Sequence, residues 1–317
     1  ASEGYQTEVL GNCGSEVAQL GLKYVHNDTC YPALLVIGQF LDALNSGKYD
    51  LDHTALLITQ TGGGCRASNY IKLLRKALVK AGYGNIPVAS LNFSGLEKGS
   101  GLPLTVPLLR KVIASIFYGD MLVALRSQTH AYEDHRGDAD AMTAKWIATI
   151  QGWIKDDKNY SAHDMKRRFY DIAADYATIP ITRVPKVKVG VVGEIYVKYS
   201  PLGNNDLEKF LESQDCEVNL PGLMGFVEYC VANYKLDIDL YGGNKLVAGG
   251  ADAFLSWLDG IGCASYDAMR KYGFYAPGSF RELMKKPEGI ISLGAKMGEG
   301  WLLTAEMIEL VQGGYGN

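Results

Sequence analysis

The residues with the clearest chemical potential form one short stretch, in which three glycines precede a cysteine and an arginine: Gly62, Gly63, Gly64, Cys65 and Arg66. Residues 55–59 are apolar or β-branched, as in a buried strand, and apolar residues recur at helical spacing over 71–81. The stretch therefore predicts a strand-to-helix turn. Glycines allow positive φ and close approach of another group, and the free N–H groups of a helix N-terminus favour an anion such as a thiolate. A tight βα turn with a buried structural thiol is the alternative interpretation.

Six cysteines are present, without a secretory signal, which indicates reduced thiols in a cytoplasm. Three lie in sequences typical of turns: Cys13 in GNCGS, Cys30 in NDTCYPA and Cys65 in GGGCRAS. The other three, Cys216, Cys230 and Cys263, lie in apolar or helical surroundings and are expected to be small buried side chains. Thiolates on separate loops can hold an iron–sulfur cluster, and glycine-rich turns let backbone N–H groups reach its sulfides.

Several other chemistries lack their motifs in this sequence. It contains no G-x-x-x-x-G-K-[ST], no G-x-G-x-x-G after a strand and no G-x-S-x-G. It also has no C-x-x-C pair and no H-E-x-x-H for a zinc site. A thiol enzyme stays open, with Cys65 as nucleophile and a histidine as its base; the candidate bases are His26, His53, His130 and His135.

Length and composition indicate a globular chain of about two domains. It has 317 residues, 47% of them hydrophobic, and a net charge of −4 without long basic runs, so nucleic acid is not an expected partner. No membrane span is expected, because the most apolar run, 112–125, contains Asp120 and has basic flanks. The first residue is not methionine and no strand follows the last expected helix, which we interpret as a fragment of a longer protein.

The order of elements predicts an α/β fold. Strand, helix, strand and helix follow one another to about residue 130, helices alone occupy the next segment, and a second strand–helix pattern begins at residue 186. The expected organisation is a first α/β lobe at 1–130, a helical bridging segment at 131–185 and a second α/β lobe at 186–317, each lobe with a parallel sheet. Cys65 and Glu194 both follow expected strand ends, where open α/β sheets bind ligands.

Five motifs, in this order, resemble one family. They are YVHNDTCYPALLVIGQFLDAL, LLITQTGGGCRASNYIKLLRKAL, IPVASLNFSGLE, VGVVGEIYVKYSPLGNND and GEGWLLTAEMIEL. Together they are similar to the acyl-CoA dehydratase activase-related proteins, and through them to the iron–sulfur subunits of 2-hydroxyglutaryl-CoA-type dehydratases. The resemblance covers nearly the whole chain.

The resemblance implies Rossmann- or flavodoxin-like lobes that hold a [4Fe-4S] cluster in a redox system of anaerobic metabolism. An activator ATPase feeds one electron to the cluster, and water is eliminated from a 2-hydroxyacyl-CoA. Cys30 and Cys65 match the first two cluster cysteines, with Cys13 as an additional ligand. The cofactor-binding residues are expected to be Gly62, Gly63, Gly64, Arg66 and Glu194. Implied partners are the activator ATPase, an acyl-CoA and a second dehydratase-like subunit.

The sequence also departs from this family. A further cluster cysteine lies in such proteins beyond the terminal helix, where this sequence stops. The expectation is therefore a lyase or reductase component that is inactive by itself and in which the cluster is labile or missing. The alternative function is a non-catalytic domain that docks an activator ATPase and has a structural Gly-Gly-Gly-Cys turn.

Overall fold

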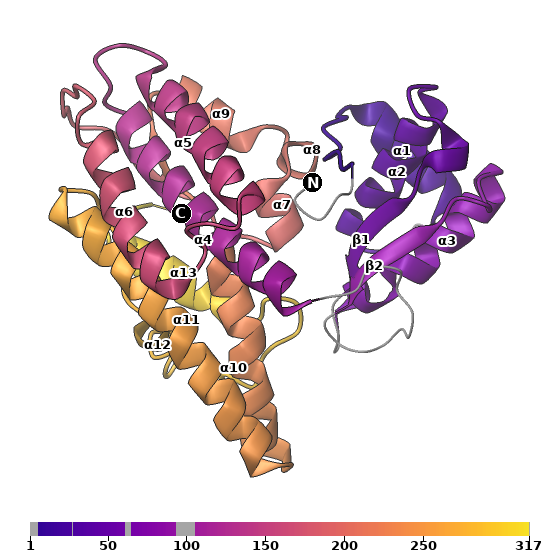
Figure 1. Ribbon diagram of the computed structural model, residues 1–317. Helices are drawn as coiled ribbons and strands as arrows, with labels where there is room; N and C mark the ends of the chain where they lie inside the picture. Colours follow the sequence, from indigo (N-terminus) through magenta and orange to yellow (C-terminus); the bar gives the residue numbers. More distant parts are fainter. Residues whose placement is uncertain (1–5, 27, 61–64, 93–104, 317) are drawn as a thin grey trace. The chain divides into compact units, whose positions relative to one another are not determined.

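The computed structural model describes residues 6–26, 28–60, 65–92 and 105–316. Their contacts divide the chain into two compact units, shown in Figure 1: residues 6–105 with 199–206, here the N-terminal unit, and residues 106–198 with 207–316, here the helical unit. The chain is mostly helical, and the described part of each unit contains one pair of short parallel strands. The division differs from the expected segments, because the helix that starts at Val106 belongs to the helical unit and not to the first lobe.

The N-terminal unit is built on a β-α-β motif. Its elements are α1 (Ser15–Tyr24), α2 (Tyr31–Asn45), the 3-10 helix η1 (Leu51–His53), β1 (Leu56–Gln60), the 3-10 helix η2 (Arg66–Asn69), α3 (Tyr70–Ala81), β2 (Val88–Asn92) and α8 (Pro201–Asn204). Strands β1 and β2 pair in parallel, with Leu56 opposite Val88. A parallel pair needs a crossover connection, and α3 provides it. The strand, helix and second strand predicted from the apolar spacing are confirmed.

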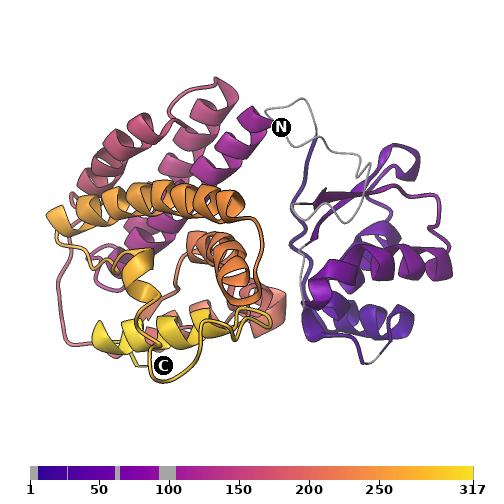
Figure 2. The ribbon, with the colours of Figure 1, turned by 90° about the horizontal axis from the view of Figure 1, so that it is seen from below.

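The helical unit has two apolar cores that share α11. Its elements are α4 (Val106–His130), α5 (Asp138–Lys155), α6 (Ala162–Tyr176), β3 (Lys188–Gly190), α7 (Ile195–Tyr199, of which Tyr199 groups with the N-terminal unit), α9 (Leu207–Ser213), β4 (Glu217–Asn219), α10 (Leu223–Tyr241), α11 (Lys245–Lys271), α12 (Phe280–Leu283) and α13 (Trp301–Gln312). Figure 2 shows α11 between the group α4–α6 and the group α10, α12 and α13. Leu258 of α11 packs in the first core, and Leu255 packs with the fully buried Trp301 in the second.

The strand pair of the helical unit is short. Strands β3 and β4 pair in parallel over three residues, with Val189 opposite Val218. On the other side of β3, Gly316 forms a parallel bridge with Val189. The buried carboxylate of Glu217 accepts hydrogen bonds from the hydroxyls of Tyr132 and Tyr315, and it thereby connects β4 with the loop after α4 and with the segment after α13. Among the described residues, no helix combines the length and apolar composition that a membrane span needs.

Helices α1 and α2 approach each other closely at two glycines. A Cβ on Gly38 would overlap the backbone carbonyl of Val17, and a Cβ on Gly21 would overlap that of Leu34. The fully buried side chains of Ile37 and Leu41, next to this contact, complete the core against β1 and α3. The position of α2, whose N-terminal end carries Cys30, therefore depends on this glycine contact.

We expect Gly38→Ala to destabilise the N-terminal unit by about 1–3 kcal/mol, because the added methyl group must push α1 away from α2. Urea unfolding followed by circular dichroism measures the change. Gly11→Ala is the matched control, since a Cβ at Gly11 meets no atom within 4 Å. Equal stability of the two variants would contradict the close helix contact.

Candidate thiol site

Cys30 lies at the start of α2. It is the N-cap residue, and its carbonyl accepts the N–H of Leu34 at 3.3 Å, so the first turn of the helix fixes its backbone. Pro32 in this turn supports the helix start, because proline needs no N–H partner there. The Cys30 Sγ atom is half-buried and lies 2.8 Å from the hydroxyl oxygen of Tyr70. The thiol is therefore accessible in part and held by a polar partner.

Cys65 lies directly before η2, as its N-cap residue. The carbonyl of Cys65 accepts the backbone N–H of Ser68 at 3.2 Å and its Oγ–H at 2.7 Å, as in a single 3-10 turn. The α-helix itself begins five residues later, at Tyr70, and the four residues of η2 lie between Cys65 and this helix N-terminus. The apolar spacing predicted a helix over 71–81, in agreement with α3, but it did not predict the 3-10 turn before that helix. The glycines of the turn, Gly62, Gly63 and Gly64, lie outside the described residues.

Two polar contacts join the Cys30 and Cys65 segments. Arg66, directly after Cys65, donates from its guanidinium to the carbonyl of Asp28 at 2.7 Å. Tyr70, at the end of the same turn, contacts the Cys30 sulfur. The two segments are about 40 residues apart in the sequence, and each contact crosses between them. The structure therefore brings together the two cysteine segments that the sequence analysis singled out.

Cys13 lies elsewhere in the same unit. Its neighbour Asn12 donates from its side-chain amide to the carbonyl of Gln39 at 3.0 Å and to the carboxylate of Asp42 at 2.8 Å. Gln39 is nine residues after Cys30, which places it roughly 13 Å further along the α2 axis. Cys13 itself is exposed, and its Sγ contacts the carbonyl of Gly11. The described contacts do not bring it to the Cys30 and Cys65 segments, and its role as a ligand stays a prediction.

Glu194 belongs to the helical unit and caps α7. Its carboxylate accepts the N–H of Val197 at 3.0 Å, and its carbonyl accepts the N–H of Lys198 at 2.7 Å. The neighbouring N–H of Ile195 is bound by Glu299 at 2.8 Å. These contacts explain the position of Glu194 by helix capping, and a role toward a cofactor stays a prediction.

Cys30 and Cys65 are the two candidate ligands whose segments the described contacts bring together. The part of the chain that the structure describes contains no group of three or more histidine, cysteine, aspartate or glutamate side chains placed to hold a metal ion. Cys216, Cys230 and Cys263 lie in the helical unit and are half-buried, which is more exposed than predicted. Burial, together with the negative charge of Asp259, raises the pKa of the Cys263 thiol and so disfavours its thiolate.

Buried ionisable groups of the helical unit were not expected from the sequence. Glu228 of α10 is 4% exposed, and burial next to the negative charges of Asp259 and Asp120 raises its pKa to about 9. Glu306 of α13 is 3% exposed, with one oxygen 3.5 Å from Lys198, and burial raises its pKa to about 7. The available signal was a carboxylate inside an apolar helical run, as Glu228 is in FVEYCV and Glu306 is in LTAEMI.

Asp120 stabilises the start of α10. Its two carboxylate oxygens accept hydrogen bonds from the N–H groups of Leu223 and Met224 at 2.9 and 2.8 Å. The N–H groups of the first turn have no partner within the helix itself, so Asp120 supplies it. Burial raises the pKa of Asp120 to about 6, against the lowering effect of these two hydrogen bonds. The carboxylate therefore has a structural role within the helical unit.

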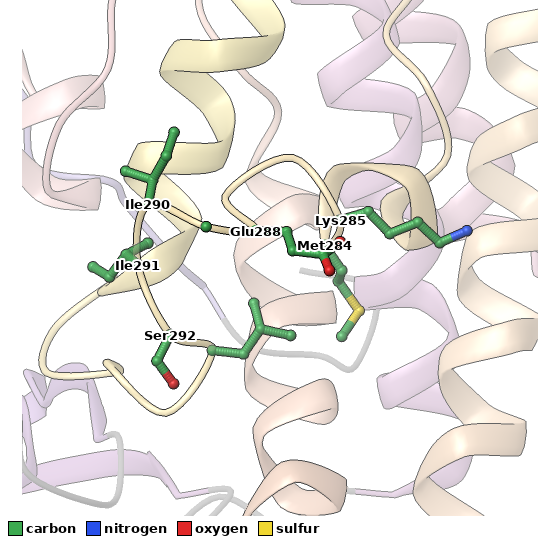
Figure 3. A pocket seen from close by; sticks show the side chains of 8 residues that line it. Met284, Lys285, Glu288, Ile290, Ile291 and Ser292 are labelled. Atoms are coloured by element: carbon green, nitrogen blue, oxygen red, sulfur yellow. The ribbon is translucent and has the colours of Figure 1, made fainter.

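Two hollows lie in the helical unit. The larger, about 580 Å³, is lined by residues 284–285 and 288–293, and Figure 3 shows the amino group of Lys285 directed away from Ile290 and Ile291. The smaller, about 80 Å³, contains His130, whose Nδ1 lies 2.9 Å from a carboxylate oxygen of Glu133. Lys186 and Asp215, which both line the smaller hollow, form an ion pair at 2.5 Å. Neither hollow contains Cys30 or Cys65.

Comparisons with family models, with curated proteins and with solved structures found no match for this chain. A functional assignment therefore depends on the site's own residues and on the motifs in the sequence.

We expect the free energy of unfolding of the helical unit to fall as pH rises from about 4.5 towards 9, because folded Glu228 keeps its proton while the unfolded chain releases it. This group lowers the free energy of unfolding by up to about 1.4 kcal/mol per pH unit in this range. Its stabilising contribution is fully present below the pKa of the glutamate in the unfolded chain. Glu228→Gln should flatten the slope, measured by urea unfolding at several pH values. Val227→Ala, which truncates a neighbouring core side chain, should lower stability equally at every pH. An unchanged slope in Glu228→Gln would contradict the buried neutral carboxyl.

Proposed function

We propose that the N-terminal unit binds an iron–sulfur cluster through Cys30 and Cys65, as a component of a low-potential, one-electron redox system. The observation that carries this proposal is the pair of contacts, Arg66 to Asp28 and Tyr70 to Cys30, that hold the two cysteine segments together. A structural thiol in a tight turn needs no such connection to a second cysteine segment.

The chemistry of the two thiols suits this cofactor. Iron–sulfur clusters are held by cysteine thiolates, which need not be adjacent in the sequence. Both sulfurs are half-buried, so iron and sulfide can reach them while the surrounding protein limits water. A bound cluster would accept and donate single electrons. Two thiols are only part of the usual set of four, so the remaining ligands must come from other residues or from another molecule.

The residues around the thiols have defined tasks in this proposal. The first turn of α2 fixes the Cys30 backbone, and η2 fixes that of Cys65. Arg66 keeps the two segments in register through the Asp28 carbonyl and places a cation beside the site, where it offsets the negative charge of a thiolate-bound cluster. These tasks are positioning and charge compensation.

The finer fold assignment is part of the same proposal. A parallel pair joined by a crossover helix is the minimal unit of a Rossmann- or flavodoxin-like lobe, and β1, α3 and β2 have this form. In the helical unit, the Gly316 bridge beside β3 supports a parallel sheet larger than two strands. We propose that both units derive from such lobes.

The resemblance of the motifs supplies the biological setting. We propose an activator ATPase as the electron donor, an acyl-CoA as the substrate of the complete system, a cytoplasmic location, and pairing with a second dehydratase-like subunit. The reaction class would be the elimination of water from a 2-hydroxyacyl-CoA. Glu194, Cys13 and the glycines 62–64 remain candidates for contacts to the cofactor or substrate.

A non-catalytic docking domain is the second candidate. It is favoured by one observation, the lack of a third metal-ligating side chain near the two thiols among the described residues. In that case the contacts of Arg66 and Tyr70 serve only to fold the turn. The two candidates differ in whether the chain binds iron and sulfide.

We expect anaerobic reconstitution with iron and sulfide to give a chain with bound iron and charge-transfer absorbance, because Cys30 and Cys65 supply thiolate ligands. Cys30→Ala and Cys65→Ala should each reduce bound iron to background. Cys216→Ala, a half-buried cysteine of the helical unit, is the matched control and should retain the iron. Equal iron in all four proteins, or none in the unchanged chain, would contradict the proposal and favour the docking role.

A further inference from the structure

The first half of helix α11 presents an uncharged face to solvent. Between residues 246 and 260, every exposed residue is small or apolar, and none is charged. The exposed faces of helices in globular proteins ordinarily carry charged and polar residues. In Figure 1, the ends of α10 and α11 that meet at residues 242–244 project beyond the other helices of the helical unit. This part of α11 therefore has the composition of a buried contact without being buried.

Four large apolar side chains dominate this face. Leu246 is 86% exposed, Val247 is 51% exposed, and Phe254 and Trp257 are each 38% exposed. The rings of Phe254 and Trp257 are stacked, with their centroids 5.7 Å apart. The apolar cores of the unit take side chains such as Leu255 from the other side of the helix. Exposed apolar patches of this kind mark interaction surfaces.

The acidic residues in this half of α11 do not lie on the uncharged face. The carboxylate of Asp252 pairs with Arg281 of α12 at 3.1 Å, and Arg281 also donates to the hydroxyl of Ser256 at 2.7 Å. The carboxylate of Asp259 accepts the backbone N–H of Phe280, the first residue of α12, at 2.7 Å. Both acids thus interact with α12. Since burying an unpaired charge is costly, a partner that covers the face must itself be uncharged over the same length.

The face is complementary to itself. Leu246, Ala253 and Gly260 recur every seven residues, which places them on one side of the helix. In an antiparallel contact between two copies of α11, with the two-fold axis at Ala253, Leu246 lies opposite Gly260 and Trp257 lies opposite Gly249. A Cβ at Gly249 or Gly260 would meet no described atom of the surrounding chain within 4 Å, so the space beside both glycines is open. Each large side chain therefore meets a position of the second copy that has room for it.

We propose that this face binds a second copy of the chain, with the two α11 helices antiparallel across a two-fold axis. A two-fold contact brings identical residues together at its axis, where like charges would repel, and here the axis residue is Ala253. The stripe from Leu246 to Gly260 spans roughly 21 Å, over which side chains of the two copies can interdigitate. The proposal is independent of the iron–sulfur function, because Cys30 and Cys65 belong to the other unit.

Sedimentation velocity of the purified chain at increasing concentrations tests the proposal. We expect a monomer–dimer equilibrium in the unchanged chain, measured with a reductant so that the free cysteines do not crosslink the copies. Ala253→Arg places two like charges at the two-fold axis, so it should raise the dimer dissociation constant at least about tenfold. Ile147→Arg is the matched control, since Ile147 is an exposed apolar residue of α5 in the same unit, and it should leave the dimer unchanged.

Gly249→Leu tests the arrangement of the helices. The added side chain has open space in the single chain, but it would occupy the position of Trp257 of the second copy. It should therefore weaken the dimer, while Gly152→Leu, at a glycine of α5 with equally open surroundings, should not. Circular dichroism checks that each variant is folded.

The outcomes decide between dimer and monomer and then between arrangements. A chain that stays monomeric at every concentration would overturn the proposal, as would a dimer that Ala253→Arg leaves intact. An equal loss of dimer in Ile147→Arg would overturn it too, because the effect would then not belong to this face. A dimer that Ala253→Arg weakens and Gly249→Leu does not would overturn the antiparallel arrangement.

Discussion

The candidate thiol site depends on the contacts between two short segments of the N-terminal unit. The carbonyl of Asp28 and the sulfur of Cys30 are bound by Arg66 and Tyr70, the residues that start and follow the 3-10 turn after Cys65. The turn is held by the β1–α3 connection, and Cys30 is held by α2, whose position depends on the glycine contact with α1. Backbone packing thus determines where the two thiols lie, and the polar contacts connect the segments that carry them.

The helical unit is marked by buried ionisable side chains. Glu228 and Glu306 are both buried, Glu228 near Asp259 and Asp120, and Glu306 near the buried cation Lys198. Burying a carboxylate is costly, and the group lowers that cost by keeping its proton or by pairing. Asp120 has a different role, because its carboxylate accepts hydrogen bonds from the first N–H groups of α10. These groups make the stability of the helical unit dependent on pH, and Cys30 and Cys65 belong to the other unit.

The sequence predicted the local elements well. Strand β1, helix α3 and strand β2 follow from an apolar β-branched run, helical spacing and a second apolar run, which are signals within a few residues of each element. The division of the chain was not predicted, because it depends on long-range contacts: α4 continues the alternating pattern of the first lobe yet packs with α5 and α6. The two cysteine segments were selected from their turn-like sequences, whereas the contacts of Tyr70 and Arg66 join residues about 40 positions apart and leave no local signal.

Iron K-edge X-ray absorption of the reconstituted chain tests the central claim most directly, because it reads the atoms around the metal. We expect a first shell of sulfur with iron–iron scattering beyond it, and loss of this spectrum in Cys65→Ala. A first shell of oxygen or nitrogen without iron–iron scattering, or a sulfur shell that Cys65→Ala leaves unchanged, would contradict a cluster held by Cys30 and Cys65.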